Sequence, residues 1–448
     1  MSGARSIIII GGGASGILLA AHLLRRADDR LQVTVIEKRG QVGRGVAYSA
    51  ERNNLILNVA ASNMSAYADE PNHFRDWLTR THPELPDDPF LFAPRQYYGA
   101  YLRDVLRNSA AGSDTARLTI VEAEGLSVHE VGKGIEVGLT DGTTRFGDIA
   151  VLAVGHEEQP SRGKGIAVRA DSDADTPLPA DAAVMILGSG LSMVDAWLSL
   201  MDRQHRGRIL IVSRHGLLPL AHKQVAPFRI DAADVPFGTN LRYFTRWFRE
   251  LAATVVAEGG DWRSVVDGLR PYNQRIWQAW DRSARRQFLE HVRPLWNIHR
   301  HRLPPRLHAL MQNAISGGQV ELVAGKLVDL SRMDGEVQVR FRRRGASEPE
   351  IVKVARAYDC GGVTLDVQSS SNPVITALLA QRAARADEQR IGLDVSLDLQ
   401  VVDSGGRPSS RLYAVGPLTR GKFFEIEAIP DIRRQCADLA ERLLGIAA

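Results

Sequence analysis

Cysteine is almost absent from this 448-residue chain, which contains only Cys360 and Cys436. The two lie far apart in the sequence and form no Cys-x-x-Cys pair. This spacing excludes a zinc ribbon and a redox-active dithiol, because both need paired thiols. We therefore expect two buried, unreactive cysteines, and no metal site is predicted.

Long hydrophobic runs and an excess of one charge are also missing. The apolar run near the N-terminus is broken by three glycines after four isoleucines, so it predicts neither a signal peptide nor a membrane span. The net charge of +4 is too small to indicate a nucleic-acid partner. With 44% hydrophobic and 24% charged residues, the composition is that of a globular protein whose length allows two or three domains. We expect a cytoplasmic protein with no membrane partner.

The strongest pattern in the sequence lies between Ile7 and Glu37. Four isoleucines predict a buried strand, the glycine-rich run from Gly11 to Gly16 predicts a tight turn, and apolar residues at helical spacing follow it. Residues 32–37 then predict a second buried strand, which ends in an acid. A strand, a G-x-G-x-x-G turn, a helix and an acid in this order are the fingerprint of a dinucleotide-binding fold.

Each part of this turn has a role in binding a nucleotide. Gly11 permits the tight turn, Gly13 lets a pyrophosphate approach the backbone, and Gly16 lets the helix pack on the strand. The phosphates then lie against free N–H groups at a helix N-terminus. Glu37 can accept a hydrogen bond from a ribose 2′-hydroxyl and repels a 2′-phosphate, which favours FAD or NAD over NADP. An ordinary structural turn is the alternative. The candidate contacts are Gly11, Gly13, Ala14, Ser15, Gly16, Glu37 and Lys38.

The same pattern returns in the second half of the chain. Residues 184–187 predict a strand that runs into Gly188-Ser189-Gly190-Leu191-Ser192-Met193. Arg214 stands 26 positions after Gly188, the interval that separates the first turn from its acid. An arginine in that place can pair with a 2′-phosphate, so the second site is predicted to prefer NADPH. A solvated arginine is the alternative, and Met193 stands where close helix packing favours glycine. The candidate contacts are Gly188, Gly190, Ser192 and Arg214.

Other candidate contacts of the first nucleotide lie outside its turn. Residues 40–101 leave the strand–helix alternation, and a long cofactor would meet the protein there beyond its adenosine end. A helical cover on the sheet edge is the alternative for the aromatic residues of this segment. Buried strands that end in glycine are typical of the carboxyl edge of a parallel sheet, where a cofactor crosses. The candidate contacts are Asn58, Met64, Ser65, Arg95, Gly155 and Gly416. No catalytic residue is predicted.

Five of the seven tryptophans lie between residues 227 and 305, in a segment with many arginines and few strand signals. This composition predicts an inserted helical subdomain. The tryptophans have core-like helical spacing, whereas base stacking needs exposed rings, so we expect a small core and no nucleic-acid partner. The arginines are then either solvated or directed at an anionic substrate.

The predicted fold class is α/β, with two Rossmann-like dinucleotide-binding domains, one inserted in the other, and a helical insertion. The first domain is expected to comprise residues 1–160 and 366–448. The second is expected to comprise 178–226 and 311–365, separated by the helical insertion at 227–310. Strands predicted at 320–323, 327–330, 336–341 and 351–358 complete the second domain.

The two glycine motifs and the C-terminal tail resemble the bacterial FAD/NAD(P)-binding flavoproteins related to flavin-containing and N-hydroxylating monooxygenases. The resemblance covers nearly the whole chain, and segments 58–65 and 416–425 are its more specific parts. It implies FAD in the first domain and NADPH in the second. It further implies that NADPH reduces the flavin by hydride transfer. A flavin C4a-hydroperoxide formed with molecular oxygen would then hydroxylate a small-molecule substrate, anionic or amine-bearing.

Two other functions fit the same sequence. An NAD(P)H-dependent flavin reductase would pass the electrons to another acceptor. A non-catalytic flavin-binding sensor would hold the cofactor without turnover. The sequence carries no signal for the oligomeric state.

Overall fold

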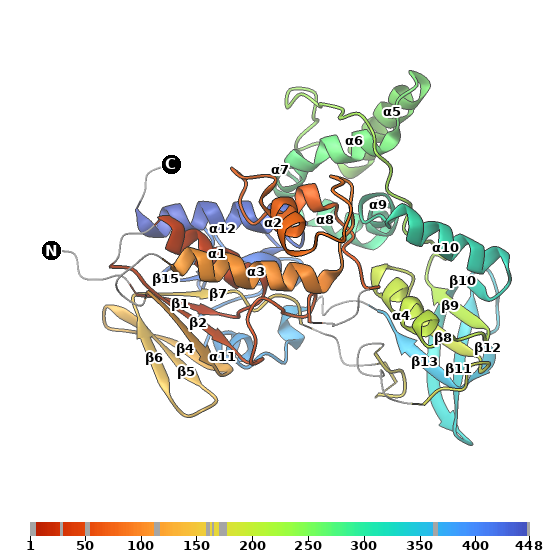
Figure 1. Cartoon of the computed structure of the whole chain (residues 1–448), viewed down its shortest axis with the longest axis horizontal. Helices are drawn as coiled ribbons and strands as arrows, with labels where there is room; N and C mark the ends of the chain where they lie inside the picture. The colour runs from red at the N-terminus through yellow and green to blue at the C-terminus, as the bar shows by residue number, and fades with distance from the viewer. Residues whose placement is uncertain are drawn as a thin grey trace. The chain divides into compact units, whose positions relative to one another are not determined.

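The computed structural model describes residues 6–26, 30–49, 54–111, 117–157, 162–163, 165–169, 177–361 and 366–445 (Figure 1). The chain divides into two compact units. The first unit comprises residues 1–157, 272–282 and 364–448, and the second comprises 158–271 and 283–363.

The first unit is built on a six-stranded sheet in the order β14-β15-β7-β1-β2-β3. Five neighbouring strands are parallel, and β14 pairs antiparallel with β15 at one edge. The strands are β1 (Ser6–Ile10), β2 (Gln32–Glu37), β3 (Leu118–Glu122), β7 (Ile149–Leu152), β14 (Gln400–Val402) and β15 (Pro408–Ala414).

The alternation of side chains along β1 explains why four isoleucines stand in a row. Ile7 and Ile9 lie in one hydrophobic core and Ile8 and Ile10 in another, because successive residues of a strand face opposite sides of a sheet. Both faces are covered, so every position needs an apolar side chain. Helix α1 packs between α3 and α12 on the first face. The helices of this face are α1 (Ala14–Arg26), α2 (His73–Thr81), α3 (Arg95–Ala110) and α12 (Ile429–Leu444).

A small antiparallel sheet and one helix cover the other face. The sheet is a meander inserted between β3 and β7, and it consists of β4 (Gly125–Val131), β5 (Gly134–Leu139) and β6 (Thr144–Gly147). Val128 and Val137 of this meander share a core with Ile8 and Ile10. Helix α11 (Pro373–Ala380) packs against β4.

The second unit repeats this plan. Strands β10, β9, β8 and β13 form a parallel sheet, and β11 and β12 continue from β10 as antiparallel strands. The strands are β8 (Val184–Leu187), β9 (Ile209–Ser213), β10 (Val320–Met333), β11 (Glu336–Arg343), β12 (Glu350–Val354) and β13 (Arg356–Asp359). Both expected Rossmann-like sheets are therefore present, and the predicted α/β fold class is confirmed.

Strand β10 differs from the prediction of separate strands at 320–323 and 327–330. It is one strand, and a bulge between Leu327 and Asp329 accommodates the break in the sequence pattern. Its first half pairs with β9, and its second half pairs with β11. Val339 and Phe341 of β11 share a core with Met185 of β8. The β10–β12 meander therefore covers one face of the parallel sheet, as β4–β6 does in the first unit.

The strand predicted at 351–358 is two strands with different neighbours. β12 pairs antiparallel with β11, whereas β13 pairs parallel with β8. Only Ala355 separates them, and its N–H donates to the Ala183 carbonyl (2.9 Å). The chain therefore leaves the meander and enters the parallel sheet within a single residue.

The predicted helical segment contains several helices, most of them short. They are α5 (Leu241–Ala257), α6 (Trp262–Leu269), α7 (Asn273–Ala279), α8 (Arg282–Gln287) and α9 (Arg293–Arg300), followed by α10 (Pro305–Ser316). The remaining long helix of the second unit is α4 (Leu191–Asp202). Trp277 and Trp280 are buried, and the other three tryptophans of the segment are partly buried. Helix α7 belongs to the first unit.

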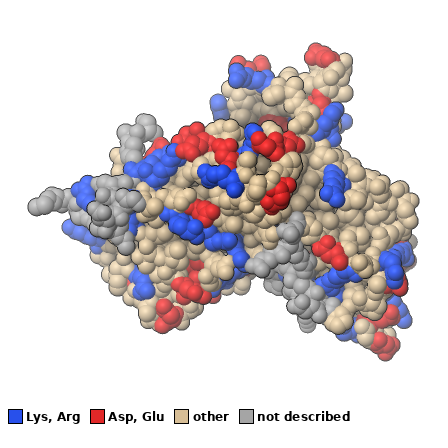
Figure 2. All heavy atoms as spheres, viewed as in Figure 1, with Lys and Arg blue, Asp and Glu red and all other residues tan. Residues whose placement is uncertain are grey.

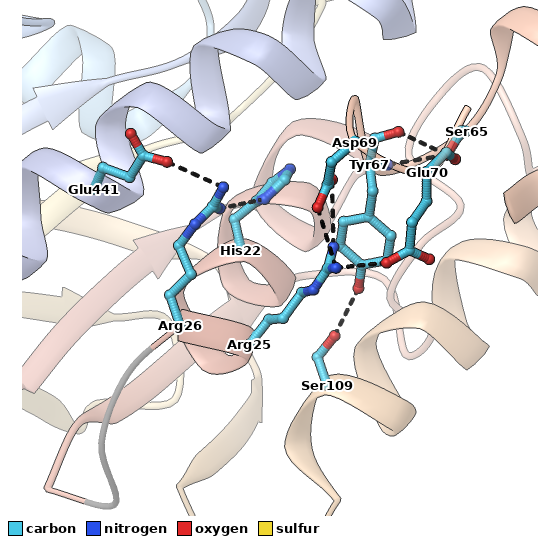
Figure 3. A network of polar contacts seen from close by, with 9 residues as sticks. All are labelled: His22, Arg25, Arg26, Ser65, Tyr67, Asp69, Glu70, Ser109 and Glu441. Carbon is cyan, nitrogen blue, oxygen red and sulfur yellow. Dashed lines mark hydrogen bonds and ion pairs between the residues drawn. The ribbon is translucent and has the colours of Figure 1, made fainter. Parts of the chain in front are cut away.

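Polar side chains of α1 join this helix to a loop and to α12 (Figure 3). Arg25 pairs with Glu70 and lies over the Tyr67 ring, 4.3 Å from its centre. Arg26 pairs with Glu441 of α12 (3.1 Å). Both pairs are partly exposed, and such pairs typically contribute only about 0.2–1 kcal/mol each.

His22 is the buried member of this network. Its ring is 1% exposed, stands edge-on to the Tyr67 ring, and lies with Nδ1 2.8 Å from an Arg26 guanidinium nitrogen. Burial, with the nearby Arg26 charge, lowers the pKa of His22 from 6.5 to about 4. The imidazole is therefore neutral at neutral pH, and Nδ1 accepts a hydrogen bond from Arg26.

The lowered pKa of His22 predicts that the folded protein loses stability in acid. His22→Phe should lose less. As the pH falls from about 6.5 to about 4, the unfolded chain binds a proton at His22 that the folded chain does not, so the free energy of unfolding falls by about 3 kcal/mol. We expect urea unfolding of His22→Phe to show a loss between pH 7 and pH 4 that is smaller by about this amount. The exposed His129→Asn should follow the wild type. Equal acid losses in wild type and His22→Phe would contradict the assignment.

Candidate nucleotide-binding sites

The turn after β1 brings the backbone against the ends of two neighbouring strands. Gly11 donates its N–H to the Ile36 carbonyl (2.8 Å). Its φ of +110° is disfavoured for other residues, and a Cβ there would overlap the Ala153 carbonyl oxygen. Only glycine fits this position without displacing the strand end.

The turn after β8 has the same geometry. Gly188 donates its N–H to the Val212 carbonyl (2.9 Å), has a φ of +121°, and would place a Cβ on the Cys360 carbonyl oxygen. Each turn therefore donates a hydrogen bond to the next strand along the chain, β2 or β9, and packs against the end of the neighbouring strand on the other side, β7 or β13. This is a structural repeat as well as a sequence repeat.

Each turn leads directly into a helix. α1 begins at Ala14 and α4 begins at Leu191, in each case three residues after the first glycine of its turn. Gly16 lies on the Gly11 carbonyl, where a Cβ would overlap it. The fully buried Met193 takes the corresponding place in α4, so its bulk does not prevent that helix from forming. Both helix N-termini present backbone N–H groups near the turn, which suits a pyrophosphate.

Glu37 is the last residue of β2 and lies beside the first glycine turn. The side chain is 8% exposed, and its two carboxylate oxygens accept hydrogen bonds from the N–H groups of Gly12 (2.8 Å) and Arg39 (2.9 Å). Each oxygen has a further lone pair, so the carboxylate can accept from a ribose hydroxyl as well. A Cβ on Gly12 would lie 2.8 Å from the Glu37 Cβ. Gly12, which the G-x-G-x-x-G reading treats as a variable position, is thus required for the placement of the acid.

Other predicted contacts of the first site lie in different environments. Lys38 pairs with Glu124 on the surface (2.7 Å). Ser15 is buried in α1. Met64 lies in the first core, and Ser65 is fully buried, where its hydroxyl donates to the Glu70 carbonyl (2.7 Å). These bonds account for Ser65 structurally, and its contact with a cofactor stays a prediction.

The remaining predicted contacts lie on loops around the carboxyl edge of the sheet. Arg95 begins α3 and donates Nε–H to the Ile56 carbonyl (3.1 Å), while Asn58 is partly buried on the same extended segment. Gly155 follows β7 with a φ of +70°. Gly416 follows β15 and donates its N–H to the Gln435 side chain of α12 (2.7 Å). The parallel strands β1, β7 and β15 are neighbours, so the Gly13, Gly155 and Gly416 loops meet at one edge.

The sequence did not point to the residues that hold the loop at 416–427. Trp277 of α7 donates Nε1–H to the Gly421 carbonyl (2.8 Å), and its ring stacks on Phe424 with centres 4.6 Å apart. Asn273 donates to the Glu425 carboxylate (2.6 Å). Glu425 itself has a φ of +63°, which is unusual for a residue other than glycine. A segment inserted among residues of the second unit thus fixes a loop of the first.

A buried carboxylate supports this loop from another side. Asp387 accepts hydrogen bonds from the N–H groups of Gly392 (2.6 Å) and Gln389 (2.8 Å). A Cβ on Gly421 would overlap its carboxyl group. Burial raises the pKa of Asp387 to about 6, and the two N–H donors oppose that rise. The acid therefore fixes the turn at 387–392, against which Gly421 of the loop packs.

His156 is a further polar group at the end of β7. Its Nδ1 is buried and has no hydrogen-bond partner among the described residues. Burial lowers the pKa of His156, which the Glu427 carboxylate opposes and the Arg420 guanidinium reinforces. A neutral imidazole with an unused nitrogen at this edge fits a polar ligand. A histidine directly after a strand-ending glycine was the sequence signal for it.

In the second unit, three of the predicted contacts are accessible to a ligand. A Cβ on Gly190 would meet no other atom within 4 Å, and Ser192 and Arg214 are exposed. Ser189 donates its hydroxyl to the Leu217 carbonyl (2.6 Å), which ties the turn to the loop after β9. Arg214 follows β9 directly, at the place where Glu37 ends β2 in the first unit.

Several other features bear on the range of functions. Both cysteines are buried and free, as expected, and burial raises their pKa values. Among the described residues, no group of three or more His, Cys, Asp or Glu side chains is placed to hold a metal ion. None of the described helices has the length and apolar character that crossing a membrane requires. Basic and acidic side chains are interspersed on the face drawn in Figure 2.

Residues 8–157 match the model of a family described as FAD-NAD(P)-binding. This segment of the chain is an FAD-NAD(P)-binding domain. It contains the Gly11 turn, Glu37 and the end of β7. The matched segment thus includes the glycine turn and the acidic end of β2 described above, whose contacts with a nucleotide stay predictions. No curated protein sequence matches the chain.

Solved structures with the same fold include N-hydroxylating flavin monooxygenases. The reduced form of ornithine hydroxylase from Pseudomonas aeruginosa has a TM-score of 0.66 and 15% identity, covering 99% of this chain and 100% of that one. L-lysine 6-monooxygenase from Pseudomonas syringae has a TM-score of 0.66 and 14% identity, with coverage of 99% and 100%. Ornithine N-hydroxylase from Kutzneria sp. 744, with reduced FAD, NADP+ and L-ornithine, has a TM-score of 0.65, 14% identity and coverage of 99% and 100%. Identities this low establish a common fold.

The contacts around the first turn predict different effects for substitutions at two adjacent glycines: one should affect FAD binding and the other stability. A Cβ on Gly13 would only touch the Gly45 Cα at 3.6 Å, so Gly13→Ala should leave stability within about 0.5 kcal/mol of wild type while blocking the approach of phosphate. Gly12→Ala collides with Glu37 and should destabilise even the flavin-free protein, by about 1–3 kcal/mol. Urea unfolding of the flavin-free proteins and FAD titration separate the two. Normal FAD affinity in Gly13→Ala would refute the role of Gly13.

The contacts of α7 predict a second effect. Trp277→Phe keeps a ring against Phe424 but removes the hydrogen bond to Gly421, so the loop at 416–427 should exchange its amide hydrogens faster, by a factor corresponding to about 1 kcal/mol. Hydrogen exchange followed by mass spectrometry measures this directly. Trp247→Phe, a change on α5, is the matched control and should leave the loop unchanged. If both variants exchange at the wild-type rate, the hydrogen bond from Trp277 to Gly421 does not stabilise the loop.

Proposed function

We propose that the protein is an FAD-dependent, NADPH-using monooxygenase that hydroxylates a small amine-bearing or anionic substrate through a flavin C4a-hydroperoxide. The observation that carries the proposal is the pair of turns with the same geometry and side chains of opposite charge beside them. Glu37 follows the first turn and Arg214 the second. A carboxylate suits the ribose of FAD, and a guanidinium suits the 2′-phosphate of NADPH.

The residues of the first unit fit FAD. The clearance beside Gly13 and the N-terminus of α1 suit the pyrophosphate, and the Glu37 carboxylate suits the adenosine ribose. The unpaired Nδ1 of His156 and the loop that begins at Gly416 lie at the same edge of the sheet. When bound, the flavin supplies the hydride acceptor and the reaction with oxygen. The protein's part is to hold the ring, exclude water and orient the substrate.

The second unit would select the electron donor. Its turn leaves Gly190 open to a pyrophosphate, and Arg214 lies exposed beyond β9 without an ion-pair partner among the described residues. An arginine in this setting can form two hydrogen bonds with a phosphate and gains nothing comparable from a 2′-hydroxyl. We therefore assign NADPH to this unit and FAD to the first.

The choice of substrate class is supported by the fold and by composition. The relatives of the same fold are named for ornithine and lysine, which carry both an amine and a carboxylate. The arginines of the helical segment suit the carboxylate of such a molecule. A screen of amino acids and diamines for NADPH oxidation coupled to hydroxylated product would identify the substrate.

The competing functions differ in three observations. A purified protein with a flavin absorption band near ~450 nm holds the cofactor, as flavin chemistry requires. Bleaching of that band by NADPH without oxygen identifies an enzyme, and no bleaching by NADPH or NADH identifies a sensor. An oxygen-dependent flavin intermediate that forms after reduction identifies a monooxygenase. Its absence, with transfer of electrons to an added acceptor, identifies a reductase.

The assignment of NADPH predicts the effect of a charge reversal. Arg214→Glu places a carboxylate where the 2′-phosphate would bind, so anaerobic flavin reduction should lose its preference for NADPH over NADH by at least about tenfold. Stopped-flow absorbance with each coenzyme measures the ratio. Because Arg214 is exposed, the thermal midpoint should stay at the wild-type value. An unchanged coenzyme ratio would overturn the assignment of NADPH to this turn.

A further inference from the structure

Arg344 reaches the same edge of the second unit as Arg214, although the two are far apart in sequence. It directly follows β11, and its N–H donates to the Ala324 carbonyl (2.8 Å). Ala324 in turn pairs with Ser213, the last residue of β9. Gly216 packs on Ala324 so closely that a Cβ there would lie 3.0 Å from the Ala324 nitrogen. Arg344 is therefore attached to the residue on which the loop after β9 rests.

The described residues supply no ion-pair partner for Arg214 or Arg344 at this edge. Arg343 pairs with Glu350 (2.6 Å) and Glu321 (3.2 Å), which satisfies it. Arg344 and Arg214 form no ion pair with a described residue. The adjacent residues Arg343 and Arg344 thus have different environments, and Arg344 lies on the side of the predicted phosphate site.

Both Arg214 and Arg344 lie close enough to His215 for their charges to act on its imidazole. Burial lowers the pKa of His215, and the charges of Arg214 and Arg344 lower it further. Among the described residues, two guanidiniums and no carboxylate act on this imidazole, so the place repels cations and favours an anion. A phosphate monoester, which carries a charge of about −1.5 to −2 at neutral pH, satisfies such a site.

We propose that Arg344 and His215 complete, with Arg214, the site that binds the 2′-phosphate of NADPH. This inference rests on the proposed assignment of NADPH to the second unit. Arg344 comes from the β10–β12 meander, so the meander contributes to coenzyme selection as well as to the core. His215 provides a hydrogen-bond donor between the two guanidiniums.

The direct test uses the full chain and two small probes. 2′,5′-ADP carries the 2′-phosphate, and 5′-AMP lacks it, so the ratio of their dissociation constants isolates the phosphate contact. Isothermal titration of Arg344→Gln should show binding of 2′,5′-ADP weakened about tenfold or more and binding of 5′-AMP unchanged. His215→Gln should show a smaller loss of the same selectivity.

Arg340→Gln is the matched control, because Arg340 is an exposed arginine of the same strand, farther from Ala324. It should leave both dissociation constants at the wild-type values, and all three variants should keep the wild-type thermal midpoint. If Arg344→Gln and Arg340→Gln bind 2′,5′-ADP equally well, the role of Arg344 is refuted while NADPH binding stands. If the wild type itself does not prefer 2′,5′-ADP to 5′-AMP, the assignment of NADPH fails instead.

Discussion

The close approach of a glycine turn to a strand end is the constraint on which both units depend. At Gly11 and at Gly188 the Cα lies against the carbonyl of a residue that follows another strand, Ala153 or Cys360. A side chain would separate the turn from the sheet, and the helix that follows would begin elsewhere. Because the first and third residues of each turn are glycines, the N–H groups at the start of α1 and α4 stay available to a phosphate.

In the proposed function, the same scaffold acquires two specificities through the residue that ends or follows its second strand. Glu37 is fixed by two backbone N–H groups, which hold its carboxylate at the site before any nucleotide binds. Arg214 is exposed and forms no ion pair with a described residue, so it can reorganise around a phosphate. A preorganised acid and an unpaired cation discriminate by different means, one by repelling a dianion and the other by attracting it. Opposite charges on one geometry therefore suit a protein that must bind two dinucleotides without exchanging them.

Local patterns predicted the parts of the structure that depend on neighbours in sequence. The strand of the isoleucine run, both glycine turns and the helix after the first turn follow from strand period, turn chemistry and helix spacing. The path of β10 and the change of sheet at Ala355 did not follow, because the local sequence marks neither the bulge between Leu327 and Asp329 nor the partner of each strand. Strand partners are set by long-range packing, which a single sequence does not encode locally.

The candidate sites divide in the same way. Gly11, Gly16 and Glu37 were found because the motif fixes their spacing. Gly12 was missed because only the three-dimensional position of Glu37 shows that a Cβ would collide there. Trp277 has a spacing that fits a helical core, and nothing in that spacing reveals that its ring lies against Phe424. Arg344 could not be placed without the register of β9, β10 and β11.

A crystal structure of the protein with FAD and NADP+ tests the central claim most directly. The account predicts the adenosine ribose of FAD within hydrogen-bond distance of Glu37, and the 2′-phosphate of NADP+ against the Arg214 guanidinium. Density for NADP+ at the Glu37 turn, or for FAD at the Arg214 turn, would contradict it.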